Sequence, residues 1–229
     1  MEKVFPSAEA AIADVFDGAT IMFGGFASAG SPTTLILALK HKGVQGITGI
    51  ANNIGIGDRL DDLCESFQLK KMVCSFAIRA SSAAKSRFEQ QYRQGLVELE
   101  LMPQGTLAER IRAGGAGIGA FYTPTGVGTV VEAAKEKRTI DGRDYLLEYP
   151  LRADFAFLKA HKADRFGNLV YRYASRNFNA VMATAADVVI AEVDEIVEPG
   201  ELDPELVVTP SVYVDRIVKG DRHVIRWYT

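Results

Sequence analysis

The sequence predicts an α/β fold in which a mostly parallel β-sheet is covered by helices. Two observations support this class: short apolar runs alternate with helical segments, and the connections between them are short. A third is size, because 229 residues that are 48% hydrophobic can bury one sizeable core. No linker, repeat or low-complexity segment interrupts the chain, so we expect a single domain over residues 1–229.

The first half of the chain is expected to supply strands and helices in turn. Ser7 is the expected N-cap of the first helix, and Ser31 that of the second, with Pro32 at its first helical position. Thr106 and Glu109 have the spacing of a capping box for a later helix. Strands are expected at 19–23, 46–51, 70–76 and 96–102, and helices at 7–16, 31–40, 59–67, 84–94 and 106–113.

The C-terminal half is expected to add hairpins to this pattern. Asp141-Gly142 lies between polar-apolar runs, which strongly indicates a β-hairpin. Residues 153–172 are expected to form a second strand pair that turns at Gly167-Asn168, and residues 186–193 to form a buried strand.

Composition excludes several classes of partner and site. A formal net charge of −3 without a clustered Lys/Arg face argues against nucleic acid. No run approaches the roughly 18 apolar residues that cross a bilayer, and the N-terminus lacks a secretory apolar stretch. Cys64 and Cys74 are expected as buried free thiols in a reducing cytoplasm, rather than as a disulfide or metal pair. His41, His161 and His223 lack ligand spacing, so no metal site is expected.

The stretch MFGGFASAGSP, residues 22–32, is a glycine-rich connection between an expected strand and an expected helix. It is not a P-loop, because Ser31-Pro32 follow the last glycine where the lysine and metal-binding hydroxyl belong. It is not a dinucleotide fingerprint either, because Gly24 and Gly25 are adjacent. Two interpretations remain: a tight strand-to-helix turn, or a place where backbone N–H groups face an anion or acyl group.

Further motifs give this connection a family context. The sequence resembles, nearly from end to end, the α subunit of the family I coenzyme A transferases. The resemblance rests, in order, on residues 17–32, 51–55, 102–129, 151–172, 175–186 and 192–205.

The resemblance implies a three-layer α/β/α domain and a CoA-transfer reaction. In this family a glutamate attacks the donor acyl-CoA, captures CoA as an enzyme thioester and passes it to an acceptor acid. That glutamate belongs to a Ser-Glu-Asn-Gly motif of the β subunit, which this sequence lacks. The resemblance therefore implies no nucleophile in this chain, a β partner in an αβ or α2β2 complex, CoA as a thioester substrate and no permanently bound cofactor.

Site residues are carried over from the same resemblance. The family assigns the glycine segment to CoA binding or to the cleft wall. Gln104 matches the position that holds the substrate carboxylate or the oxyanion, and Asn52 and Asn53 lie beside the same cleft. Structural alternatives are a core role for Phe26, a turn cap for Gln104 and ordinary turn residues for the asparagines. The glycine segment comprises Gly24, Gly25, Phe26, Ala27, Ser28, Ala29 and Gly30.

Residues 73–95 give an indication of the acceptor acid, because they resemble the subgroup that uses 3-oxoadipate with succinyl-CoA. A dicarboxylic acceptor needs a cation for its distal carboxylate, and Arg79 is the candidate, with a solvated surface arginine as the alternative. Other functions stay open: transfer to acetoacetate or short-chain fatty acids, a non-catalytic acyl-CoA-binding partner, and a sugar-phosphate isomerase-like protein.

Overall fold

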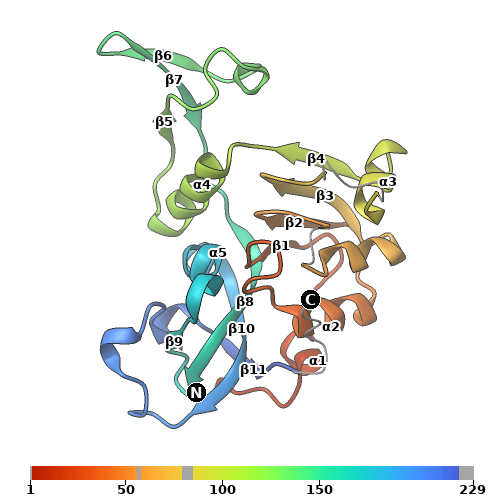
Figure 1. Ribbon diagram of the computed structural model, residues 1–229, viewed down its shortest axis with the longest axis vertical. Coiled ribbons are helices and arrows are strands. Elements are labelled where there is room, and N and C mark those ends of the chain that lie inside the picture. The colour runs from red at the N-terminus through yellow and green to blue at the C-terminus, as the bar shows by residue number, and fades with distance from the viewer. Residues whose placement is uncertain (1, 56–57, 79–84, 222–229) are drawn as a thin grey trace.

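The computed structural model describes residues 2–55, 58–78 and 85–221, and its centre is an eight-stranded sheet (Figure 1). The strand order is β11-β10-β8-β1-β2-β3-β4, with β9 beside β8. All pairs are parallel except β8 with β9, so the expected mostly parallel sheet is confirmed. The strands are β1 (Thr20–Phe23), β2 (Ile47–Ala51), β3 (Leu69–Cys74), β4 (Glu98–Leu101), β8 (Ala153–Asp164), β9 (Leu169–Val170), β10 (Ala186–Val197) and β11 (Arg216–Lys219).

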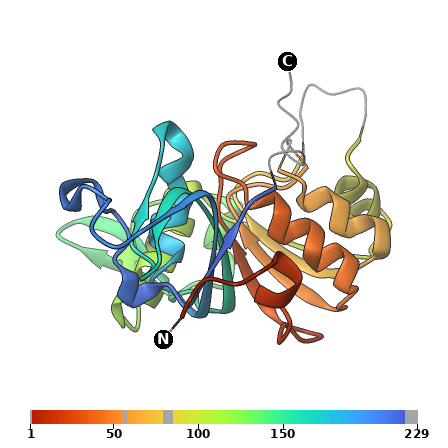
Figure 2. The same cartoon turned by 90° about the horizontal axis from the view of Figure 1, so that it is seen from below.

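Helices cover both faces of this sheet, as the three-layer expectation requires (Figures 1 and 2). Residues of α1, α2 and α3 share one buried cluster, and residues of α4 and α5 share the other. The α-helices are α1 (Ala8–Ala11), α2 (Thr33–Lys42), α3 (Arg87–Arg93), α4 (Gln104–Ala116) and α5 (Asn177–Met182). Single turns of 3₁₀-helix occur at η2 (Val130–Glu132), η3 (Tyr173–Arg176), η4 (Pro204–Leu206) and η5 (Ser211–Tyr213), and a longer one at η1 (Leu60–Ser66).

Strand alternation divides the core between the two faces. On β1, Phe23 belongs to the cluster under α2, whereas its neighbour Met22 belongs to the cluster under α4 and α5. Phe23 meets Phe157 of β8 edge to face, with 5.6 Å between ring centroids. The middle strands are therefore apolar on both sides, as parallel strands covered by helices must be.

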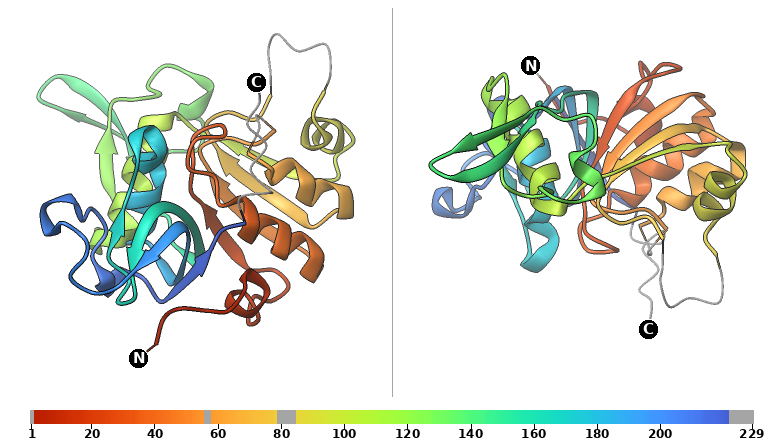
Figure 3. Two further views of the ribbon diagram at one scale, coloured as in Figure 1. Left: turned by 60° about the horizontal axis from the view of Figure 1, so that its bottom comes forward. Right: turned by 90° about the horizontal axis from the view of Figure 1, so that it is seen from above.

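A three-stranded antiparallel sheet, which we call the arm, projects from this body (Figures 1 and 3). It consists of β5 (Phe121–Thr123), β6 (Lys137–Ile140) and β7 (Arg143–Glu148), in the order β5-β7-β6. Asp141 and Gly142 join β6 to β7 with φ values of 50° and 77°, as a type I′ hairpin turn requires. Both hairpins expected from the sequence are confirmed, since β8 and β9 also pair across residues 165–168.

Three expected helix starts and ends are corrected. Ser7 does cap α1, accepting a hydrogen bond from Ala10 N at 3.2 Å, but that helix ends at Ala11 instead of residue 16. Ser31 does not cap α2: the N-cap is Pro32, no side-chain capping hydrogen bond is present, and the Ser31 hydroxyl donates to the Asp58 carbonyl at 2.7 Å.

The expected capping box of α4 is also wrong. The helix starts at Gln104, where the Pro103 carbonyl accepts from Leu107 N at 2.9 Å, so Thr106 already lies within the first turn. The helix expected at 59–67 is the 3₁₀-helix η1 (Leu60–Ser66). Arg59 and Phe67, which flank it, both have left-handed backbone conformations.

Candidate functional site

The site expected from the sequence lies at the carboxyl edge of the central sheet. The glycine loop, residues 24–30, follows β1; Asn52 and Asn53 follow β2; and Gln104 follows β4 as the first residue of α4. Because β1, β2, β3 and β4 are parallel neighbours, their carboxyl ends lie at one edge. Topology thus brings together three segments that are far apart in the sequence.

A chain of amide hydrogen bonds joins these segments. Gln104 Nε2 donates to Asn52 Oδ1 at 2.7 Å, and Asn52 Nδ2 donates to Asn53 Oδ1 at 2.8 Å. The same Asn53 oxygen accepts from the backbone N–H of Ala27 at 2.8 Å. Asn52 and Asn53 are buried, whereas Gln104 is exposed, so the chain runs from the buried edge of the sheet to its surface. The turn-cap alternative for Gln104 is wrong, because this residue opens a helix.

Asp58 anchors the buried end of this amide chain, and the sequence did not mark it. Asn53 Nδ2 donates to Asp58 Oδ2 at 2.6 Å, and Leu60 N donates to Asp58 Oδ1 at 3.1 Å. The carbonyl of Asp58 holds the Ser31 hydroxyl at the far end of the glycine loop. The carboxylate of Asp58 is buried, 4% exposed, and occupied by donors, which suits a structural anchor and not a nucleophile.

The glycine loop itself forms a very small hairpin. Phe26 and Ala29 exchange two backbone hydrogen bonds of 3.0 Å, and Ala27 between them has a left-handed φ of 51°. The side chain of Phe26 is 49% exposed, so the core alternative for this residue is wrong. The loop therefore presents an aromatic ring and the exposed Ser28 to solvent beside the amide chain.

Asn179 packs against the buried side of the glycine loop. Its role there was not predicted from the sequence. It is fully buried; its Nδ2 donates to Gly30 O at 3.0 Å, and its Oδ1 accepts from Lys159 N at 2.8 Å. A Cβ on Gly24 would lie 1.8 Å from this same Oδ1. The structure thus explains Gly24 by internal packing, whereas the sequence suggested close approach of a ligand. The SRNFN segment offered the only hint, as a motif without an assigned role.

The N-terminus of α2 does face an anion, as one interpretation of the loop required, but the anion belongs to the protein. Glu192 of β10 accepts from Thr34 N at 2.8 Å and from Leu35 N at 3.2 Å through the same carboxylate oxygen. Its other oxygen lies 3.2 Å from Lys159 Nζ. Burial raises the pKa of Glu192, against the opposing charge of Lys159 and the two helix amides.

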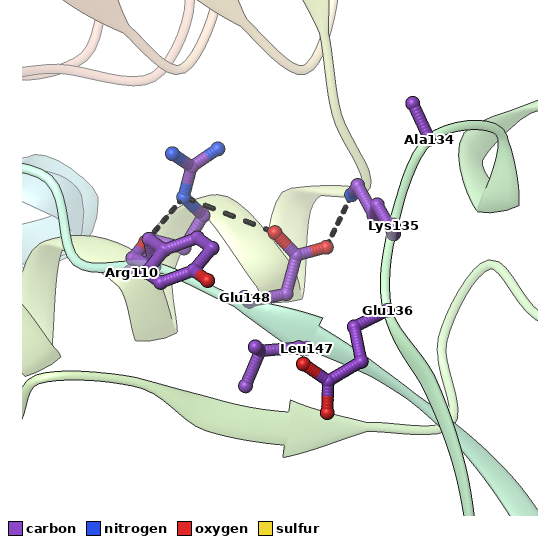
Figure 4. Close-up of a pocket in the computed structure, with 7 residues that line it drawn as sticks. Arg110, Ala134, Lys135, Glu136, Leu147 and Glu148 are labelled. Carbon is purple, nitrogen blue, oxygen red and sulfur yellow. Dashed lines mark hydrogen bonds and ion pairs between the residues drawn. The ribbon is translucent and has the colours of Figure 1, made fainter.

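A separate cavity of ≈ 390 Å³ lies between the root of the arm and α4 (Figure 4). Its centre is the buried carboxylate of Glu148, which pairs with Lys135 and lies 3.9 Å from Arg110 Nε. Arg110 also donates to Tyr149 O at 2.6 Å, so it ties α4 to the end of β7. Of the site residues expected from the sequence, none that the structure describes lines this cavity, and its ion pairs indicate a structural clamp.

The remaining candidates are placed as follows. Arg79 lies outside the described residues. Cys64 and Cys74 are buried free thiols, as expected, and burial raises the pKa of each to about 12. Within the described ranges, no group of three or more metal-binding side chains could hold an ion, and no helix is long and apolar enough to cross a membrane.

Comparison with protein families identifies the family to which this chain belongs. A family model described as Coenzyme A transferase matches residues 5–220. The chain belongs to the coenzyme A transferase family. This membership decides against the sugar-phosphate isomerase-like alternative.

Several bacterial relatives of this CoA-transferase chain are similar to it over nearly their whole length. The A-type subunit of a 3-oxoadipate CoA-transferase from Pseudomonas putida is 51% identical, with 95% of this chain and 94% of the relative covered. The A-type subunit of a probable succinyl-CoA:3-ketoacid coenzyme A transferase from Bacillus subtilis is 47% identical, covering 96% and 91%. The expectation of a CoA-transferase chain of the α type is confirmed.

Solved structures confirm the fold. An acyl-CoA transferase from E. coli O157:H7, solved as a thioester complex with CoA, has a TM-score of 0.84 at 25% identity. It covers all of this CoA-transferase chain, which spans 49% of that longer chain. Glutaconate coenzyme A-transferase from Acidaminococcus fermentans has a TM-score of 0.82 at 20% identity, covering 97% of this chain and 77% of its own.

Proposed function

We propose that this chain is the α subunit of an enzyme that moves CoA from succinyl-CoA to a 3-oxo acid, with 3-oxoadipate as the best candidate acceptor. A β subunit supplies the glutamate that carries CoA as a thioester. The observation that carries this proposal is the amide chain from Ala27 through Asn53 and Asn52 to Gln104. It holds neutral hydrogen-bond donors at the sheet edge, and the one carboxylate bonded into it, Asp58, is buried.

Gln104 is suited to stabilise an oxyanion because the described residues leave one N–H of its side-chain amide free to donate a hydrogen bond. A glutamine amide carries two N–H groups, and Asn52 accepts from Nε2. The second N–H has no partner among the described residues and lies at the exposed end of the amide chain. A neutral donor that is already oriented stabilises charge as it develops on a carbonyl oxygen.

The reaction then follows from covalent catalysis by the partner's glutamate. The glutamate carboxylate attacks the donor thioester carbonyl, and the CoA thiolate leaves as a mixed anhydride forms. The thiolate attacks the glutamyl carbonyl of that anhydride and releases the donor acid. The acceptor carboxylate reverses these two steps and leaves as its CoA thioester. Each attack places negative charge on a carbonyl oxygen, which the Gln104 N–H stabilises.

The relatives support a dicarboxylic or 3-oxo acceptor, since their names include both 3-oxoadipate and 3-ketoacid transferases. CoA is then a substrate and not a resident group. Soluble substrates of this kind suit a cytoplasmic enzyme, and the complex with the β subunit is αβ or α2β2.

The test of this function is a transfer assay on the complex. The chain is co-expressed with a β-type subunit, and CoA transfer from succinyl-CoA is measured for a panel of acids. Gln104→Ala is expected to raise the activation free energy of transfer by about 3 kcal/mol, which lowers the rate roughly a hundredfold. Gln90→Ala is the matched control, because Gln90 is an exposed helical glutamine whose amide donates to Lys85 O.

Two outcomes would contradict the proposal. Turnover by this chain without a partner would show that the nucleophile is not in a β subunit. Binding of acyl-CoA by the complex without any transfer would instead favour a non-catalytic acyl-CoA-binding partner.

Arg79 provides the test of acceptor choice, on sequence grounds alone. We expect Arg79→Ala to raise the KM for 3-oxoadipate much more than the KM for acetoacetate, because only the former has a distal carboxylate. The measurement is steady-state kinetics of the complex with both acids. Equal changes in the two KM values would remove Arg79 from the specificity of the site.

A further inference from the structure

The N-terminus of α2 is where the glycine loop returns to regular structure, and its own sequence does not cap it. Pro32 makes no side-chain capping hydrogen bond, and the Ser31 hydroxyl is used by the Asp58 carbonyl. The first amides of a helix lack partners inside the helix and favour a carboxylate. Glu192, which is 158 residues from Thr34, supplies that carboxylate from β10.

The surroundings of Glu192 keep its carboxylate in one place. The residue is 0% exposed, so water does not replace its protein partners. Lys159, its neighbour across β8 and β10, contacts one oxygen and also lies 2.7 Å from Asp194 Oδ1. A Cβ on Gly220 would lie 2.7 Å from Glu192 Oε1, so this glycine leaves the room that the carboxylate occupies.

We propose that Glu192 is a positioning residue for the transferase site: by capping α2 it fixes the exit of the glycine loop, residues 30–32. The proposal rests on the function proposed above. Among the described residues, no hydrogen bond joins Glu192 to Asn53 or Gln104, so it acts through the backbone of the loop. Asn53 holds the middle of that loop at Ala27, and Glu192 holds the first turn of the helix into which the loop leads, at Thr34.

Two variants separate the cap from the charge. Glu192→Gln keeps an oxygen that accepts from the amides of Thr34 and Leu35, but it removes the charge. The double variant Glu192→Met/Lys159→Met removes the acceptor without leaving a buried charge unpaired. Buried ion pairs are often replaced by apolar residues of similar volume without loss of the fold, so the double variant is expected to fold. In Glu192→Gln the Lys159 ammonium keeps its ion pair with Asp194 Oδ1 at 2.7 Å, so this charge is not left unpaired.

The control is a carboxylate that accepts a backbone hydrogen bond elsewhere. Asp154 Oδ2 accepts from Thr20 N at 2.7 Å, at the start of β1 and therefore at the end of that strand opposite the glycine loop. Asp154→Asn disturbs the same sheet without touching the cap. If Asp154→Asn alters the loop in the same way as the double variant, the effect is a general destabilisation of the sheet and not a loss of the cap.

The readouts are hydrogen exchange of residues 24–36 and steady-state kinetics of the complex with the β subunit. In the double variant we expect exchange of this segment to be about tenfold faster and kcat to be about ten- to a hundredfold lower, because small misplacements at a site are costly. Glu192→Gln is expected to stay close to the wild type in both the exchange rate and kcat. Asp154→Asn is expected to leave exchange of the loop at the wild-type rate.

Wild-type exchange of residues 24–36 in the double variant would overturn the proposal. The same holds if Asp154→Asn loosens the loop equally. If the wild-type complex transfers no CoA, the proposed function fails, whereas the exchange experiment still decides whether Glu192 holds the loop.

Discussion

Single side chains that join distant segments define the site at the scale of the residue. Asn53 accepts from the backbone of Ala27, accepts from Asn52 and donates to Asp58. One buried amide therefore fixes the glycine loop, the end of β2 and the loop before η1. Because its donor and acceptor groups are both used, rotation of this amide would leave buried groups unsatisfied. Its position is consequently determined by several bonds at once.

The fit of Gly24 against Asn179 gives a test at the same scale. Gly24→Ala would place a methyl group 1.8 Å from Asn179 Oδ1, and Asn179 is fully buried and bonded at both ends of its amide. We expect this variant to be less stable by about 1–3 kcal/mol, because overpacking forces its neighbours apart. The measurement is urea-induced unfolding.

Gly105→Ala is the control for that experiment. A Cβ on Gly105 meets nothing within 4 Å, and the residue lies in the first turn of α4. Alanine there is expected to keep or raise the free energy of unfolding, by up to about 1 kcal/mol. Equal stability of the Gly24 and Gly105 variants would show that the loop yields to Asn179 without cost.

At the scale of the element, an arginine ties the last strand to the end of α1 and to the turn that follows this helix. Arg216 of β11 donates to both carboxylate oxygens of Asp14, at 2.5 and 2.6 Å, and to the carbonyl of Ala11 at 2.6 Å. The hydrogen bond from Arg216 lowers the pKa of Asp14 below 3.8. This bidentate contact joins the two ends of the described chain.

The lowered pKa predicts how this contact depends on pH. A depressed folded-state pKa stabilises the fold above the unfolded value of 3.8, and the contribution is lost as pH falls through the folded value. Asp14→Asn is expected to cost about 0.5–1 kcal/mol at pH 7, since Asp14 is 52% exposed. The difference from wild type should shrink by pH 3.

Unfolding curves at the two pH values measure this difference, and a double-mutant cycle with Arg216→Gln isolates the pair. A difference between wild type and Asp14→Asn that stays constant from pH 7 to pH 3 would contradict the assignment.

At the scale of the whole molecule, the sheet joins the two halves of the chain. β8 pairs directly with β1, so the C-terminal half supplies the middle of the sheet, and the arm is inserted before it. Asn179 reaches the glycine loop, and Glu192 reaches the first turn of α2, only because of this pairing. Loss of the middle strands would therefore disrupt the site and the core together.

The buried cysteines report on opening of this core. Cys64 and Cys74 are 1% and 0% exposed, and burial raises the pKa of each thiol to about 12, so the reactive thiolate is scarce in the folded protein. We expect neither thiol to react with iodoacetamide at pH 8 until urea unfolds the protein. Mass spectrometry of labelled peptides measures this, and rapid labelling in the native state would contradict it.

Local patterns in the sequence were enough to predict the family, the alternation of strands and helices, and the positions of the glycine loop, Asn52, Asn53 and Gln104. These follow from local patterns and motifs, which a single segment carries whatever its neighbours. The expected start of α4 was wrong because the helix begins two residues earlier, at Gln104, so Thr106 lies inside its first turn. The expected start of α2 was wrong because a capping pattern indicates which groups can bond, but not which distant partner they meet in the folded chain. Ser31 bonds the carbonyl of Asp58, for example, and leaves α2 to Glu192.

The roles of Asp58, Asn179 and Glu192 became visible in the folded chain and not in its sequence. Asn179 bonds a residue 149 positions away and Glu192 one 158 positions away. Such partners are chosen by the order of strands in the sheet, which no local pattern records. Most buried polar groups form hydrogen bonds because leaving them unpaired is costly, and the partners at hand depend on how the whole chain folds.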